Sequence, residues 1–214
     1  SLKFLKNFLH LPNIAESWMY DNVKGDIKIE ELYAEYDLIN NHIIENSIQG
    51  KAQIKDAKIR FHKDVDAVNT KSLDIFFKDN RLHFNLMEPM FKDKKLDGSF
   101  VLINNLTSEK NGQVDVFLKT NSKLDKDILD ILKAYNITLP IVQKSGNTQA
   151  SLLMKFPYDT TKNMSTYGEF FLNDAKVAIN NFEFESKNAE VILDDSIIKI
   201  KNSEIQKSSS NWGA

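Results

Sequence analysis

The sequence GKAQIKDAKI at residues 50–59 returns as GEFFLNDAKV at residues 168–177, and this pair decides the fold. Both segments begin with glycine, continue with apolar side chains, and contain Asp-Ala-Lys before a branched apolar residue. The offset between them is 118 residues (168 − 50). Alternating apolar and polar residues are the pattern of a β-strand with one buried face. The Asp-Ala step shifts the alternation by one position, which predicts a β-bulge in each copy.

The similarity continues on both sides of this pair. At the same offset Leu32, Tyr36 and Leu38 lie over Ala150, Met154 and Phe156, and KSLDIFFKD (71–79) lies over KNAEVILDD (187–195) at offset 116. We therefore predict about two copies of one unit, at about 15–103 and 121–205, each made of a helix, a strand, a long loop, a bulged strand and a hairpin. The alternative is chance similarity between strands of like composition. Repeated units of this kind bury their apolar faces by stacking on one another.

The rest of the chain has strand periodicity with two helical interruptions. Helical spacing covers 2–22, where Pro12 breaks the run and Asn13 is a candidate cap, and 124–135, where Asn121 or Ser122 is a candidate cap. Because glycine is scarce, turns are expected at Asp-Asn-type pairs. The predicted strands are 27–38, 50–61, 72–78, 81–87, 95–103, 112–120, 148–156, 168–179, 187–193 and 196–205, and the predicted turns are Asp79–Asn80, Asn104–Asn105, Asn180–Asn181 and Asp194–Asp195. The fold class is thus α+β, mainly β, with a long, twisted and curled antiparallel sheet of about ten strands and one or two short helices.

Composition excludes several classes of function. The 28 Lys and Arg are balanced by 30 Asp and Glu, which gives a formal net charge of −2. Nucleic acid is therefore not expected as a partner, because phosphate binding needs a clustered basic excess. There are no cysteines, so disulfides, thiol catalysis and Cys-ligated zinc are excluded. No apolar run approaches the ~18 residues that a membrane-spanning helix needs.

No catalytic or metal-binding constellation stands out in the sequence. The four histidines (His10, His42, His62 and His83) lack metal-site spacing, and His83 is expected to face water. Two Asp-x-Asp pairs, at Asp64 and Asp125, hint at calcium but lack the other residues of a calcium loop. We predict no enzyme activity, no metal and no cofactor. A hydrolase whose carboxylates cannot be located from the sequence stays as an alternative.

Three segments carry a resemblance to a known family. GKAQIKDAKIRF (50–61), LDIFFKDNRLHF (73–84) and LDGSFVL (96–102) resemble the AsmA-like superfamily, and most closely its YhdP branch. Members show a glycine-opened strand with Asp-Ala, followed by a hairpin with regularly spaced Leu and Phe. The helical segment 124–135 lies where YhdP-like chains place a short helix between β units. The resemblance covers roughly residues 15–205.

The resemblance implies a periplasmic protein that is anchored to the inner membrane. Its repeats would form a taco-shaped β-groove that carries phospholipid between the inner and outer membranes, with no catalytic residues. The partners implied are phospholipid acyl chains, the membrane through regions outside this chain, and neighbouring repeats of the same protein. On this interpretation residues 1–214 are one elongated groove segment, and 206–214 form a flexible tail.

The strand alternation nominates the side chains that would face the groove. They are apolar residues at inward positions: Ala52, Ile54, Ile59, Phe61, Leu73, Ile75, Phe77, Leu82, Phe84, Leu152, Met154, Phe156, Leu172, Val177, Ile179, Val191, Leu193, Ile198 and Ile200. The same alternation also builds an ordinary β core. A non-enzymatic scaffold or protein-interaction domain of the cell envelope is therefore the second hypothesis, and an open or closed apolar face distinguishes the two.

Overall fold

The fold is an open antiparallel sheet with two short helices, as the sequence predicts. A computed structural model of the chain describes residues 11–44, 47–108, 110–139, 141–179, 182–201 and 205–207. Hydrogen bonding orders the main strands as β1-β4-β5-β6-β9-β10-β11-β12-β13-β14, with β7, β8 and β15 attached beside this path. The chain divides into two compact units: unit 1 is 1–118 with 153–165, and unit 2 is 119–152 with 166–214.

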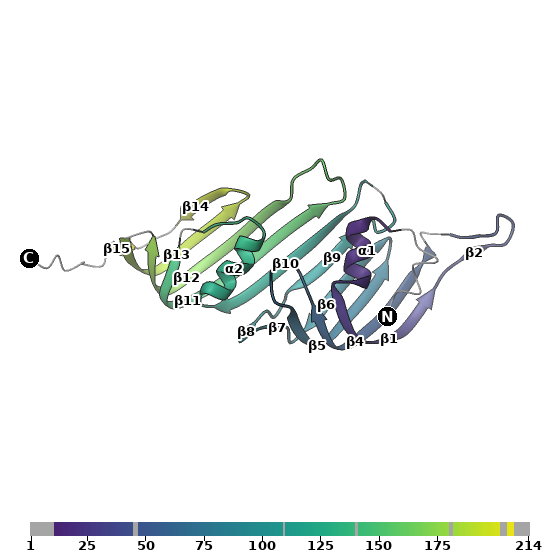
Figure 1. The fold of residues 1–214 in the computed structure, drawn as a ribbon, viewed down its shortest axis with the longest axis horizontal. Helices are drawn as coiled ribbons and strands as arrows, with labels where there is room; N and C mark the ends of the chain where they lie inside the picture. The colour runs from purple at the N-terminus through teal and green to yellow at the C-terminus, as the bar shows by residue number, and fades with distance from the viewer. Residues whose placement is uncertain are drawn as a thin grey trace, which may run out of the picture. The chain divides into compact units, whose positions relative to one another are not determined.

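Unit 1 contains the first helix and most of the strands. Figure 1 shows α1, drawn in purple, lying across the strands of this unit. Its elements are α1 (Asn13–Tyr20), β1 (Val23–Tyr33), β2 (Tyr36–Asp37), β3 (His42–Ile43), β4 (Gln49–Ile59), β5 (Val68–Lys78), β6 (Arg81–Met87), β7 (Met90–Phe91), β8 (Lys94–Lys95), β9 (Phe100–Asn104) and the first part of β10 (Gln113–Ser122).

Unit 2 repeats the order of a helix followed by long strands. Its elements are α2 (Lys126–Ala134), most of β11 (Val142–Pro157), β12 (Ser165–Ile179), β13 (Phe182–Asp194), β14 (Ile197–Lys201) and β15 (Ile205–Lys207). The predicted repeat boundaries, 15–103 and 121–205, stay a prediction.

The turns confirm the prediction from scarce glycine where they lie in the described residues. Asp79 and Asn80 both have positive φ, 51° and 57°, and join β5 to β6 in a two-residue hairpin. Such hairpins need a left-handed backbone at both turn positions, which Asp and Asn tolerate. Asn105 and Asp195 are also left-handed, but Asn104 and Asp194 are the last residues of β9 and β13, so these two turns begin one residue later than predicted. The predicted turn at Asn180–Asn181 lies outside the described residues.

Several predicted boundaries are wrong, and each has a physical reason. Helix α2 is capped by Asp125, whose Oδ1 accepts hydrogen bonds from the backbone N–H groups of Asp127 and Ile128, so neither Asn121 nor Ser122 is the cap. Helix α1 begins at Asn13 itself and has no side-chain cap. The strand predicted at 27–38 ends at Tyr33, because residues after it form the separate β2–β3 hairpin. The one predicted at 95–103 is shortened to Phe100–Asn104, since β7 and β8 form their own hairpin before it.

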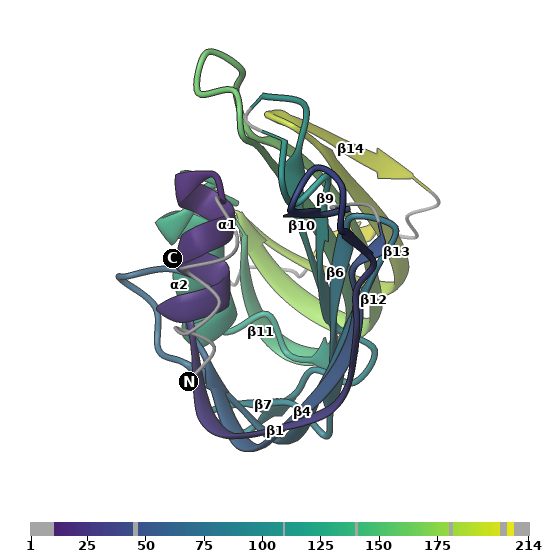
Figure 2. The same cartoon turned by 90° about the vertical axis from the view of Figure 1, so that its right-hand side faces the viewer.

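A line of unusual backbone, here called the crease, crosses the strands of unit 1. Gly25 in β1 has a φ of 146°, and it lies beside a register shift between Lys24 and Asp26. Asp56 in β4 has a φ of 47°, and the ladder between β4 and β5 passes over it to Ala57, which pairs with Thr70. Figure 2 shows β1 and β4 strongly bent.

Unit 2 contains a matching crease. Gly146 in β11 has a φ of 86°, Asp174 in β12 has a φ of 44°, and Ala175 pairs with Ser186 in β13. Asp56 and Asp174 are the aspartates of the two similar segments in the sequence. The one-residue slip predicted there is therefore a left-handed residue in the strand, opposite a positive-φ glycine in its neighbour.

The crease explains why the alternation slips in the sequence. In β4 the buried side chains are Ala52 and Ile54 before Asp56, and Ala57 and Ile59 after it. A regular strand would place these two pairs on opposite faces. The left-handed residue turns the backbone, so that the apolar positions stay inside while the strand bends.

Candidate functional site

Rows of apolar side chains cross unit 1 at right angles to its strands. Residues directly opposite each other on antiparallel strands place their side chains on the same face of the sheet. The rows, which together are called the apolar face, are Ile29-Ala52-Ile75-Phe84-Val101-Val116, Ile27-Ile54-Leu73-Leu86 and Phe77-Leu82-Ile103-Val114. The first row spans six strands, or roughly 24 Å at the usual strand spacing.

Most of the apolar face is buried in this structure. Leu73 is 0% and Phe84 1% exposed, and Leu82 is equally enclosed, whereas Phe77 is half-buried and Ile29 is exposed. The structure adds four fully buried members that the predicted set lacks, namely Val101, Ile103, Val114 and Val116. Their strands showed alternation in the sequence, so the signal was present for them too.

Other predicted groove residues of unit 1 lie beyond these rows. Ile59 is buried past the crease and pairs with Val68. Phe61 follows β4 and packs edge-on against Trp18 of α1, with ring centroids 5.7 Å apart. Met154 is fully buried and Phe156 is half-buried at the end of β11.

Helix α1 packs against unit 1 through its apolar side chains, and Trp18 contacts Phe61 beyond the apolar rows. Ala15, Trp18 and Tyr20 are its buried side chains, and Figure 2 shows the helix on the concave side of β1 and β4. The helix is short, with eight residues and no side-chain cap. Helices of this length are marginal by themselves and depend on packing.

The predicted residues of unit 2 form a smaller apolar patch. Gly168 and Phe170 of β12 lie opposite Leu193 and Val191 of β13, and these two lie opposite Ile198 and Ile200 of β14. Buried members also include Leu152, Leu172 and Val177, while Ile198 is half-buried and Ile200 is exposed. For Ile179 only the backbone is described, and it pairs with Phe182. Phe170, which is buried, was missed by the prediction.

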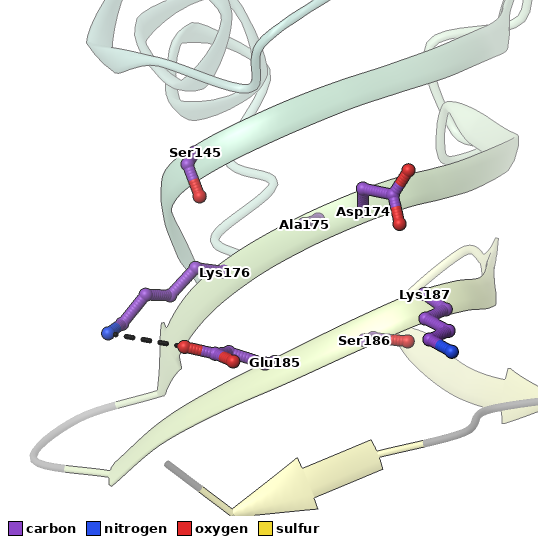
Figure 3. A pocket seen from close by; sticks show the side chains of 7 residues that line it. All are labelled: Ser145, Asp174, Ala175, Lys176, Glu185, Ser186 and Lys187. Carbon is purple, nitrogen blue, oxygen red and sulfur yellow. Dashed lines mark ion pairs between the residues drawn. The ribbon is translucent and has the colours of Figure 1, made fainter.

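A polar pocket of about 330 Å³ lies at the crease of unit 2. Figure 3 shows Lys176 reaching toward Glu185, 3.5 Å from Nζ to Oε1, with Asp174 and Lys187 on neighbouring strands. Ser186 also lines it, and its buried hydroxyl has no hydrogen-bond partner among the described residues. The pocket is charged and mixed in sign, so it does not extend the apolar patch.

The outer face of unit 1 holds His83, which was predicted to face water. The structure instead half-buries it, with its ring 5.4 Å from that of Phe100 in an edge-on contact. Its Nε2 is buried and has no hydrogen-bond partner in the part of the chain described. Burial lowers the pKa of His83 below its ordinary value of 6.5.

We expect this histidine to make folding less stable in acid. As pH falls below about 6.5, the unfolded chain binds a proton at His83 and the folded chain resists it, so stability is lost. His83→Gln should flatten that part of the curve of unfolding free energy against pH, measured by urea denaturation. The control His42→Gln, at an exposed histidine of β3, tests whether the loss of any histidine has the same effect. Identical pH curves for wild type and His83→Gln would contradict the assignment.

The residues considered for metal binding are otherwise engaged. Asp66 pairs with Lys92 at 3.6 Å, the carboxylate oxygen Oδ2 of Asp64 lies 3.7 Å from His62 Nδ1, and Asp125 caps α2. Within the described ranges, no group of three His, Asp or Glu residues comes together as a metal site. Nor does any helix in those ranges have the length and apolarity to span a membrane.

Comparison with known proteins identifies a family. The family model described as YhdP protein matches residues 10–211, which is nearly the whole chain. No curated protein and no solved structure matches significantly.

Proposed function

Since the chain belongs to the YhdP family of AsmA-like proteins, we propose that it is one segment of a cell-envelope protein that moves phospholipid between the inner and outer membranes. The apolar face would solvate the acyl chains, and headgroups would stay in water. No enzymatic step is proposed. Anchoring to the inner membrane, from the periplasmic side, would come from regions outside this chain.

The unbroken row from Ile29 to Val116 carries this proposal. It runs across six neighbouring strands without a polar side chain. In this proposal lipid would move along the row from one repeat to the next. Burial of acyl chains against such a surface is favourable by about 25 cal/mol per Å². Neighbouring repeats would continue the row past Ile29, whose side chain is exposed on β1.

Lipid can reach the face only if the protein that covers it moves aside. We assign that movement in unit 1 to α1, because the helix is short, uncapped and placed on the concave side of the strands. Entry of an acyl chain would replace the contacts of Trp18 and Ala15 with equivalent apolar contacts.

A non-enzymatic scaffold is the second candidate, and the burial of the face favours it. Leu73 and Phe84 are covered as in the core of an ordinary β protein. In a scaffold the cover would stay in place, and edges or helices would bind partner proteins. The two candidates therefore differ in whether the purified chain takes up lipid.

The test uses two neighbouring phenylalanines of β5. Phe77 belongs to the apolar face, and Phe76 points to the opposite side and is 40% exposed. Native mass spectrometry with lipid extraction should find phospholipid with the wild type and with Phe76→Asp, and little or none with Phe77→Asp. Because neither side chain is fully buried, both variants are expected to fold, whereas an aspartate at the buried Ile54 would unfold the chain.

The outcome separates the two candidates. A lipid-free wild-type chain that takes up no added phospholipid would reject the lipid role and leave the scaffold. Equal lipid content in Phe76→Asp and Phe77→Asp would show that the lipid lies elsewhere than on the apolar face.

A further inference from the structure

The β2–β3 hairpin presents two large aliphatic side chains at its tip. Leu38 is 86% and Ile39 is 93% exposed, the highest values among the large apolar residues described. They lie in the turn, beyond the pairs Tyr36–Ile43 and Asp37–His42 that hold the hairpin together. Figure 1 shows the hairpin projecting away from β1, so the body of unit 1 does not cover its tip.

The turn is held in shape by its own side chains. Asp37 Oδ1 accepts hydrogen bonds from the backbone N–H groups of Ile39 and Asn40, at 2.9 and 3.0 Å. Asp37 Oδ2 accepts from the side chain of Asn40 at 2.7 Å, and the Tyr36 hydroxyl donates to Asn41 Oδ1. The tip therefore satisfies these polar groups without help from water.

Neither the sheet nor the repeat explains this exposure. A further strand added along β1 would cover Ile29 and its neighbours, but it could not reach a turn that lies past the last ladder pair. The equivalent connection between β11 and β12 is short and polar, with Asp159, Thr161 and Lys162. The apolar tip therefore occurs in the first copy, whereas the second copy has a polar connection at the equivalent place.

We propose that the tip of the β2–β3 hairpin inserts into the interfacial region of a phospholipid bilayer. Leu38 and Ile39 would enter the upper part of the acyl chains. Tyr33 and Tyr36, which are half-exposed, would lie at headgroup depth, where amphipathic rings are favoured. This contact is separate from lipid passage along the sheet and goes beyond the proposed function.

The hydrogen bonds of the turn favour a bilayer over a protein pocket. A segment that enters the upper acyl region loses part of its hydration, so backbone N–H groups that are satisfied internally lower the cost of insertion. Asp37 does this for Ile39 and Asn40, while a protein pocket could supply partners of its own. Residues 33–48 contain no Lys or Arg, so the attraction does not depend on anionic lipid. The acidic groups Glu35 and Asp37 limit the insertion to a shallow depth.

Because the chain has no cysteine, a single label can report on the tip. The full chain carrying Leu38→Cys labelled with the environment-sensitive dye NBD is mixed with vesicles of phosphatidylethanolamine and phosphatidylcholine. We expect a blue shift of the emission and quenching by lipids that carry a nitroxide near the headgroup. The same label at Asn163→Cys, in the polar connection between β11 and β12, should not respond.

Vesicle flotation supplies the matched variants. Leu38→Ser with Ile39→Ser should weaken binding by about tenfold or more, because two aliphatic side chains would no longer be buried in the acyl region. Val142→Ser with Ile197→Ser removes two exposed aliphatic side chains elsewhere and should leave binding unchanged.

A label at residue 38 that ignores vesicles would overturn the proposal and leave a protein partner as the cover for the tip. Binding that requires anionic lipid would overturn it as well. Phospholipid that co-purifies equally with the wild type and the Leu38→Ser, Ile39→Ser variant would show that the proposed function stands whatever the hairpin does.

Discussion

Gly146→Ala is expected to lower the free energy of unfolding by about 3 kcal/mol or more. Gly146 has a φ of 86°, which side chains other than glycine rarely adopt. A methyl group there would lie 2.6 Å from Cα of Ala175 and 2.8 Å from the carbonyl oxygen of Asn173. Both contacts are with backbone, so no flexible side chain can move to relieve them. Urea denaturation of the wild type and the variant measures the loss.

Alanine variants of two further glycines test whether the crease requires glycine. Gly25 holds the same place in unit 1, where a methyl group would lie 2.8 Å from the carbonyl oxygen of Lys55, so Gly25→Ala should also be strongly destabilising. Gly50 is the control, because its backbone is ordinary and its nearest neighbour would be 3.4 Å away. If Gly146→Ala is as stable as Gly50→Ala, the crease does not need glycine and the interpretation fails.

The repeat in the sequence predicts the crease better than it predicts the ends of elements. The shared Asp-Ala step fixed the position of the slip at Asp56 and Asp174, and both residues are left-handed in the structure. What the pattern could not show is that the neighbouring strands complete the feature. Gly25 and Gly146 are remote in sequence from these aspartates, and only the pairing of strands brings them together.

The ends of helices and the burial of single residues depend on individual capping and packing contacts. The spacing of apolar residues in the sequence does not show these contacts. Asp125 caps α2 in preference to Asn121 or Ser122, since its carboxylate reaches two backbone donors of the first turn. His83 follows the alternation to the outer face, as predicted, yet Phe100 packs over it from the next strand. A single-strand pattern cannot show which residues of other strands cover an outward position.

The sequence predicts which side of the sheet is apolar, but it does not predict whether that side is buried. Alternation placed Ile54, Leu73, Ile75 and Phe84 on one side of their strands, and the register pairs Ile54 with Leu73 and Ile75 with Phe84. It could not show whether that side would be covered, because an open groove and a packed core have the same period. The burial of Leu73 and Phe84 is a tertiary property, which the pattern of one strand does not contain.

Phe84→Ala is expected to destabilise unit 1 by about 3–5 kcal/mol, because it would leave a cavity in a packed interior. Phe84 is 1% exposed and lies in the middle of the longest apolar row, between Ile75 and Val101. The control is Phe76→Ala on the adjacent strand, where the side chain is 40% exposed and the expected loss is within about 1 kcal/mol. Urea denaturation of both variants, after removal of lipid, gives the comparison.

The same measurement determines whether the apolar face is closed in solution. In an open groove Phe84 would already contact water, and its truncation would cost little more than that of Phe76. A small loss for Phe84→Ala would therefore contradict the closed face seen here and remove the need for α1 to move. A large loss of unfolding free energy that becomes smaller when phospholipid is added would mean that acyl chains fill the space left by the ring. This result is expected if lipid and α1 compete for the same surface.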